Sequence, residues 1–238
     1  ELTLASRLLG GEQRLEVYLP PRFRRDRRYP LLIVHDGRDF LRFASLQTVL
    51  DNLISRFEVE PLVVALTQSP ERLREYAADP AHADFLALEA LPLLEERYPL
   101  RPEARHRGLL GASFGAVAAL HAAWTHQGLW DRLLLQSGSF AFTDIGSGPD
   151  NPIIEPVVEF MNAFREDPGR PAGQIYLSCG QYEALIYENR SLVPVLQRAD
   201  IKLRYREARD GHNWENWRDR LREGLCYLFP GPLWMVYE

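Results

Sequence analysis

Short apolar runs alternate along this chain with longer segments in which apolar side chains recur every three or four residues. The run 31–34 is apolar at every position, which is typical of a strand buried on both faces of a sheet. By contrast, the segment 40–57 repeats its apolar residues at helical spacing. On these patterns we predict strands at residues 2–9, 12–19, 31–34, 62–66, 108–112, 132–136, 174–179 and 201–207. We predict helices at 40–57, 83–98, 114–126, 153–164, 183–198 and 214–229, with Pro92 bending the second.

The order of these elements indicates one architecture. Strands that alternate with helices imply a mainly parallel central sheet with helices on both faces. Gly10 and Gly11 form a two-residue turn between the first two strands, which adds an antiparallel hairpin at one edge. Because we find no internal repeat, linker or low-complexity tract, we expect residues 1–238 to form a single α/β domain.

The pentapeptide at 111–115, Gly-Ala-Ser-Phe-Gly, stands where a predicted strand gives way to a predicted helix. In α/β-hydrolases a G-x-S-x-G sequence at such a junction forms the nucleophile elbow, a turn that lifts the serine hydroxyl out of the sheet. Ser113 would then adopt a strained backbone conformation, and a side chain at Gly111 or Gly115 would collide with neighbouring backbone. The alternative is an ordinary glycine-rich turn that cradles phosphate, which a base and an acid later in the chain would argue against.

Two further loops carry the groups that such a serine needs. Reactive side chains of an open α/β sheet lie just beyond the carboxyl ends of its strands. Glu183 follows the predicted strand 174–179 and His212 follows the strand 201–207, which gives the nucleophile, acid, base order of α/β-hydrolases. The histidine would take the serine proton, and the carboxylate would fix the histidine tautomer. Asp210 is the competing acid, although its place two residues from His212 favours a turn-forming role.

An acyl-transfer site also needs two amide donors for the oxyanion of its tetrahedral intermediate. We expect the first from Phe114, the residue after the nucleophile. The second comes from the loop after an earlier strand in this fold. We assign it to the amide of Arg38, with Gly37 allowing the turn, and we expect Asp36 beside them to be structural.

The composition of the chain limits the classes of partner and cofactor that we expect. The 238 residues carry a formal charge of −5 from 33 acidic and 28 basic side chains that are well mixed, which argues against a nucleic-acid or membrane-surface partner. Cys179 and Cys226 lack the spacing of a metal or redox site, and we expect no cofactor and no metal. No apolar run reaches the length of a membrane span and no signal peptide is visible, which favours a cytoplasmic protein. The chain starts at Glu1 rather than Met, however, so a removed leader stays an open alternative.

Several blocks of the chain resemble the esterase family that includes enterochelin esterase. The blocks are His35-Asp36-Gly37, 72–76, 84–86, 111–115, 136–140, 180–183 and, most specific, Gly211-His212-Asn213-Trp214 followed by Trp217-Arg218. The resemblance implies a serine esterase of the α/β-hydrolase fold with Ser113 as nucleophile, His212 as base and Glu183 as acid. The family also includes carbohydrate esterases, formylglutathione hydrolases and mycolyl transferases, so a siderophore trilactone is one substrate among several.

We therefore predict a cofactor-free carboxylic-ester hydrolase that acts on a small ester through an acyl-enzyme. Trp214 and the irregular segment 140–172, with Phe140 and Phe142, are expected to wall the substrate pocket. Arg72, together with Arg38 and Arg74, would bind an anionic ferric catecholate or else form structural ion pairs with neighbouring acids. Two other functions stay open, an acyltransferase of the same fold and a hydrolase-fold binding protein without activity. The sequence identifies neither the ester nor the oligomeric state.

Overall fold

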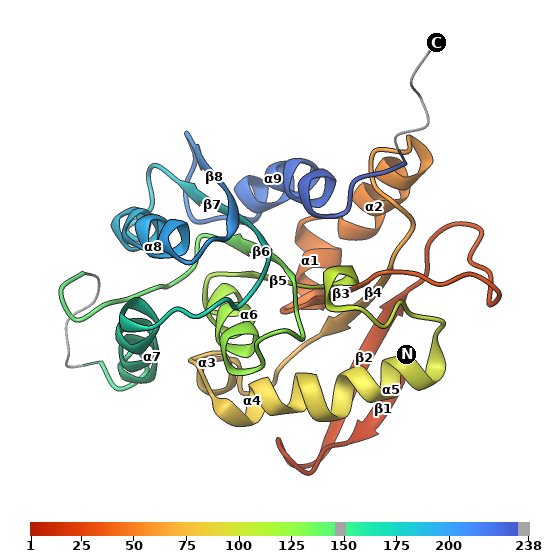
Figure 1. The fold of residues 1–238 in the computed structure, drawn as a ribbon, viewed down its shortest axis with the longest axis horizontal. Helices are drawn as coiled ribbons and strands as arrows, with labels where there is room; N and C mark the ends of the chain where they lie inside the picture. The colour runs from red at the N-terminus through yellow and green to blue at the C-terminus, as the bar shows by residue number, and fades with distance from the viewer. Residues whose placement is uncertain (146–150, 233–238) are drawn as a thin grey trace.

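The computed structural model describes residues 1–145 and 151–232, and its centre is one sheet of eight strands (Figure 1). The strand order is β1-β2-β4-β3-β5-β6-β7-β8. Strands β3 to β8 run parallel to one another, whereas β1 and β2 form an antiparallel hairpin in which β2 pairs antiparallel with β4. The strands are β1 Leu2–Ala5, β2 Glu12–Tyr18, β3 Leu31–Val34, β4 Val63–Thr67, β5 Arg107–Ala112, β6 Arg132–Gln136, β7 Gln174–Gly180 and β8 Lys202–Ala208.

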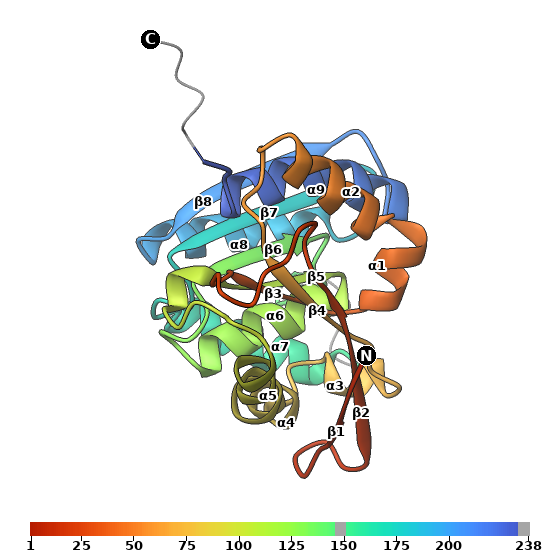
Figure 2. The same cartoon turned by 90° about the vertical axis from the view of Figure 1, so that its right-hand side faces the viewer.

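Helices cover both faces of this sheet (Figure 2). On one face, α1, α2 and α9 pack on Leu32 and Val34 of β3; on the other, α6 and its neighbours pack on Leu31 and Ile33. The helices are α1 Gly37–Phe43, α2 Leu46–Ser55, α3 Arg72–Glu75, α4 Pro80–Asp84, the π-helix η1 Phe85–Ala90, α5 Leu91–Arg97, the 3-10 helix η2 Ala104–His106, α6 Phe114–Thr125, α7 Glu155–Glu166, α8 Ile186–Arg198 and α9 Trp214–Leu228. The predicted class, a mainly parallel sheet with helices on both faces and an N-terminal hairpin, is confirmed.

The helix predicted at 40–57 is two helices in the structure. Ser45 has a left-handed backbone, with φ at 49°, and it separates α1 from α2. Such a residue interrupts the regular helical hydrogen bonds. The apolar spacing nevertheless continues across the break, because Phe40 of α1 and Leu46 of α2 are both fully buried in the same core.

The helix predicted at 83–98 begins earlier and changes its winding. It starts at Pro80, where the Asp79 side chain caps it by accepting a hydrogen bond from the amide of Ala81. The wider turn of η1 then precedes Pro92, which stands in the first turn of α5. Proline has no N–H to donate, so the departure from α-helical bonding falls directly before it.

Within residues 1–145 and 151–232, no helix combines the length and the apolar character that a bilayer crossing needs.

Candidate active site

Ser113 occupies a sharp turn between β5 and α6. Its backbone has φ 56° and ψ −123°, a conformation that residues with a side chain rarely adopt. The turn depends on glycine at position 111, because a Cβ there would lie 2.1 Å from the carbonyl oxygen of Gly115. The strand, the strained serine and the helix together form the elbow that the pentapeptide predicts.

Gly115 is required for a different reason from Gly111. A Cβ at this position would lie 3.2 Å from Cβ of His35 and 3.3 Å from Oδ2 of Asp36, which are side-chain atoms. The expected collision with backbone therefore occurs at Gly111 and not at Gly115. The close neighbours of Gly115 belong to the loop after β3, so this glycine allows that loop to pack against the start of α6.

His212 and Glu183, which their chain order predicts as base and acid, contact each other in the structure. The Nδ1 atom of His212 lies 2.9 Å from Oε2 of Glu183. The carboxylate is fully buried, while the histidine side chain is 37% exposed. Burial alone would raise the pKa of Glu183, but hydrogen bonds from His212, Ser137 and the Gly180 amide outweigh it and hold that pKa below its ordinary value. Glu183 is therefore ionised at neutral pH and able to orient the imidazole.

The sheet brings these groups to one edge. Strands β5, β7 and β8 are parallel, so Ser113, Glu183 and His212 all follow the carboxyl ends of strands. The loops after β7 and β8 touch, since the Tyr182 amide donates a 3.1 Å hydrogen bond to the carbonyl of Asp210. Gly180 permits this contact, because a Cβ there would lie 2.4 Å from the same carbonyl oxygen.

Three residues that the sequence analysis did not assign to the site hold Glu183 in place. Ser137 Oγ donates to Glu183 Oε1 at 2.6 Å, and Asn216 Nδ2 donates to the same oxygen at 3.2 Å. Trp217 Nε1 donates to Ser137 Oγ at 3.0 Å, and its ring meets that of His212 edge-on at 5.0 Å. Ser137 and Trp217 lie inside blocks that carry the family resemblance, which was the available signal for them.

The competing acid, Asp210, has a local role. Its Oδ1 accepts hydrogen bonds from the amide of Gly211 at 2.9 Å and from Asn213 Nδ2 at 3.1 Å. These bonds shape the turn that carries His212 and leave the imidazole paired with Glu183. Asp210 is thus a turn former, as its position in the loop suggested.

The hydroxyl of Ser113 lies beside another serine. Its Oγ is 3.4 Å from Oγ of Ser139, which follows β6. Among the hydrogen bonds of the described residues, none joins Ser113 to His212. Contacts of this kind are often long in ligand-free enzymes and shorten when substrate binds.

The predicted oxyanion loop lies next to the elbow and is held by an arginine. Asp36 has a left-handed backbone, with φ at 54°, directly before α1. Its buried carboxylate receives hydrogen bonds from Arg72 Nε and Nη2 at 2.8 Å each. The Arg38 amide donates to Gln68 Oε1 at 3.2 Å, so that side chain would have to move aside for an oxyanion. Phe114 is the first residue of α6, where an amide has no partner within the helix.

The residues predicted to contact substrate separate into different environments. Trp214 packs edge-on against Phe40 at 5.1 Å and against Trp217 at 4.7 Å, and Trp217 in turn contacts the ring of His212. Phe140 and Phe142 are fully buried in the core and line no open surface in this structure. Of the segment 140–172 expected to wall the pocket, residues 146–150 lie outside the described residues.

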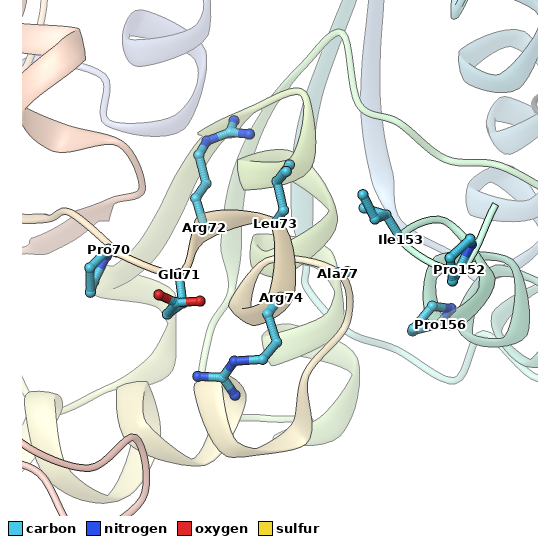
Figure 3. A pocket seen from close by; sticks show the side chains of 9 residues that line it. All are labelled: Pro70, Glu71, Arg72, Leu73, Arg74, Ala77, Pro152, Ile153 and Pro156. Atoms are coloured by element: carbon cyan, nitrogen blue, oxygen red, sulfur yellow. The ribbon is translucent and has the colours of Figure 1, made fainter.

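Arg72 lines a pocket of about 480 Å³ between α3 and the residues at the start of α7 (Figure 3). Leu73 and Ile153 stand on opposite walls of this pocket, and both are about half exposed. Arg74 points away from Arg72 and pairs with Asp79 at 3.2 Å. The three arginines considered as anion binders are thus all in ion pairs; the partners are Glu16 for Arg38, Asp36 for Arg72, and Asp79 for Arg74.

No group of three or more His, Cys, Asp and Glu residues in the ranges 1–145 and 151–232, which the structure describes, has an arrangement that would hold a metal ion.

Comparison with known proteins gives relatives over most of the chain. Residues 6–228 match the model of the family described as "Putative esterase". The chain is 21% identical over 232 residues to the uncharacterized protein YjcH of Bacillus subtilis strain 168, with 92% of each chain covered. It is 26% identical over 204 residues to the iron(III) enterobactin esterase of Escherichia coli strain K12. That match covers 84% of this chain and 50% of the relative, so the chain spans about half the relative's length.

Solved structures share the fold. An enterochelin esterase from Shigella flexneri superposes with a TM-score of 0.83 at 22% identity, over 95% of this chain and 57% of that one. A ferulic acid esterase superposes with a TM-score of 0.78 at 20% identity, over 95% of each chain. The fold is thus that of the α/β-hydrolase esterases. Because the family model covers nearly the whole chain, the protein belongs to the family described as "Putative esterase" and is an ester hydrolase.

Proposed function

We propose that this protein is a serine carboxylic-ester hydrolase that forms an acyl-enzyme on Ser113. The observation that carries the proposal is the 2.9 Å contact between His212 Nδ1 and Glu183 Oε2 at the sheet edge where Ser113 forms the elbow. A serine hydroxyl is a weak nucleophile until a base removes its proton, and a histidine held by a carboxylate is suited to that task.

The reaction follows from the roles of these atoms. Ser113 Oγ attacks the ester carbonyl carbon while His212 Nε2 takes the hydroxyl proton. The amides of Phe114 and Arg38 donate to the oxyanion that forms, the latter after release of Gln68. His212 then protonates the departing alkoxide, and the acyl group stays on Ser113. Water then attacks the acyl carbon while the same histidine takes its proton. The bond between the acyl carbon and Ser113 Oγ breaks, His212 returns the proton to that oxygen and the acid leaves, while Glu183 stabilises the imidazolium in both steps.

For the substrate, we propose a siderophore trilactone or a related ester. The support is the similarity to iron(III) enterobactin esterases of Escherichia coli and Dickeya dadantii, at 26% and 25% identity. The pocket beside Arg72 offers two apolar walls, which suit a ring or an alkyl group. A panel of esters that includes a catecholate trilactone with and without iron tests this choice. Equal rates on simple alkyl esters and on the trilactone would contradict it.

A fluorophosphonate probe tests the nucleophile. The wild-type protein should be labelled, and Ser113→Ala should not. Ser139→Ala is the matched control, because it removes the neighbouring hydroxyl and leaves the elbow serine in place. Labelling that persists in Ser113→Ala, or that disappears only in Ser139→Ala, would remove Ser113 from its proposed role.

A further inference from the structure

Glu188 is a buried acid that the proposed reaction does not use. It lies in the first turn of α8, its residue exposure is 3%, and its Oε2 has no hydrogen-bond partner among the described residues. Burial raises the pKa of Glu188 to about 7. An acid buried without a partner is costly to the fold, and such residues are concentrated at binding and catalytic sites.

Glu188 is one of the residues that line an open pocket of about 730 Å³. Ala184, Tyr187, Glu188 and Ser191 are spaced so that they share one side of the helix and of the turn before it. The other lining residues are Asp144, Ile145 and Leu185. The volume is in the range of small-molecule sites, and most of the wall is apolar.

Two acids line the pocket, and of these only Glu188 has no ion-pair partner among the described residues. Asp144 is held in a two-pronged ion pair by Arg165, at 3.1 and 2.9 Å. Arg190, on the next turn of α8, is held by Glu207 at 2.7 Å. None of the described residues that line the pocket is Lys, Arg or His.

We propose that this pocket binds the ammonium group of a small organic amine, with Glu188 as the anchor and the apolar wall against the stem of the amine. An ammonium carries three N–H donors and a positive charge, so it supplies both the hydrogen bonds and the counter-charge that Glu188 lacks. Leu185, Ile145 and the Tyr187 ring would cover the alkyl or aryl stem.

The pocket adjoins the elements that carry the active site but shares no triad residue with it. Ala184 and Leu185 directly follow Glu183 in the chain. Asn189, next to Glu188, donates a 2.9 Å hydrogen bond to the carbonyl of Gly138, one residue before Ser139. A ligand anchored at Glu188 would therefore lie next to the loop that carries Glu183 and next to the segment after β6.

Calorimetry with three probes of one shape tests the proposal: phenethylammonium, phenethyl alcohol and phenylacetate. The wild-type protein should bind the ammonium at least tenfold more tightly than the alcohol and should bind the carboxylate least. Glu188→Gln keeps the shape of the side chain and removes its charge, so it should reduce ammonium affinity to that of the alcohol. An ammonium affinity that equals that of the alcohol in wild type, or that is unchanged in Glu188→Gln, would overturn the proposal.

A second variant tests whether the ligand occupies this pocket, independently of any local rearrangement that Glu188→Gln causes. Ser191→Phe fills the pocket without altering Glu188, and it should weaken the binding of ammonium and alcohol alike. Undiminished ammonium binding in Ser191→Phe would place the site elsewhere and refute the assignment. Inhibition kinetics with phenethylammonium then identify the source of the amine. Competitive inhibition of ester hydrolysis indicates that the ammonium is a group on the substrate, whereas a lack of competition indicates a separate ligand. The two variants, Glu188→Gln and Ser191→Phe, should retain the wild-type circular dichroism spectrum.

Discussion

Replacing Glu183 by Gln should abolish most of the esterase activity while leaving the fold in place. The carboxylate uses its two oxygens differently. Oε1 accepts from Ser137, from the Gly180 amide and from Asn216, whereas Oε2 faces His212. In the variant, the glutamine oxygen must therefore take the position with three donors, and its NH₂ group must face the imidazole.

That orientation of the glutamine forces His212 into the opposite tautomer. Facing an NH₂ donor, Nδ1 of His212 has to accept a hydrogen bond, so the ring proton moves to Nε2, the atom that should take the serine proton. In serine hydrolases, the wrong tautomer costs about 10⁴ in kcat. This corresponds to about 5 kcal/mol of transition-state stabilisation. The free energy of unfolding should fall much less, by about 1–2 kcal/mol, because the three hydrogen bonds to the oxygen persist.

The assay is kcat/KM on a short-chain p-nitrophenyl ester, with urea unfolding measured in parallel. Asp210→Asn is the matched control, since it also replaces a carboxylate of the same site by its amide but disturbs only the turn before His212. We expect that control to stay within tenfold of wild type. Activity of Glu183→Gln within tenfold of wild type, or an equal loss in Asp210→Asn, would refute the assignment of the acid.

Gly111→Ala should prevent folding to the native state, since its Cβ would lie 2.1 Å from a carbonyl oxygen, whereas Gly115→Ala should cost only about 1 kcal/mol; soluble yield and thermal unfolding compare them. Arg72→Ala should destabilise the protein by about 2 kcal/mol, because it leaves the Asp36 carboxylate buried without its counter-charge, and the partial exposure of the arginine keeps the loss below that of a fully buried pair. An equal loss when Asp36→Asn is already present would contradict this pairing. Glu188 ionises at about pH 7 in the folded protein and near 4.5 when unfolded, so unfolding releases a proton between these values. Stability should therefore fall by about 3 kcal/mol as the pH rises from 4.5 to 7, with no further loss from this group above it. Glu188→Gln should remove that component, and urea unfolding curves whose pH dependence matches wild type would exclude it.

The sequence alone determined the order of the elements and the chemistry-bearing loops. Hydrophobic periodicity is a local property. The buried strand β3 and the apolar face of α9 could therefore be predicted without any knowledge of the segments that pack on them. The position of Ser113 was legible for a similar reason, because the glycines that its turn requires lie within two residues of it. Chain order then singled out Glu183 and His212, and the structure pairs them at 2.9 Å.

Only the tertiary structure decided how those groups are held and which side chains face open space. Trp217 reaches Ser137 from 80 residues away and holds Glu183 through it, a contact that no local pattern encodes. The same packing buried Phe140, which sequence reasoning placed in the pocket wall, and left Glu188 without a partner. Local spacing sets which face of an element is apolar, whereas the partners of a polar atom depend on where distant segments come to rest on the sheet.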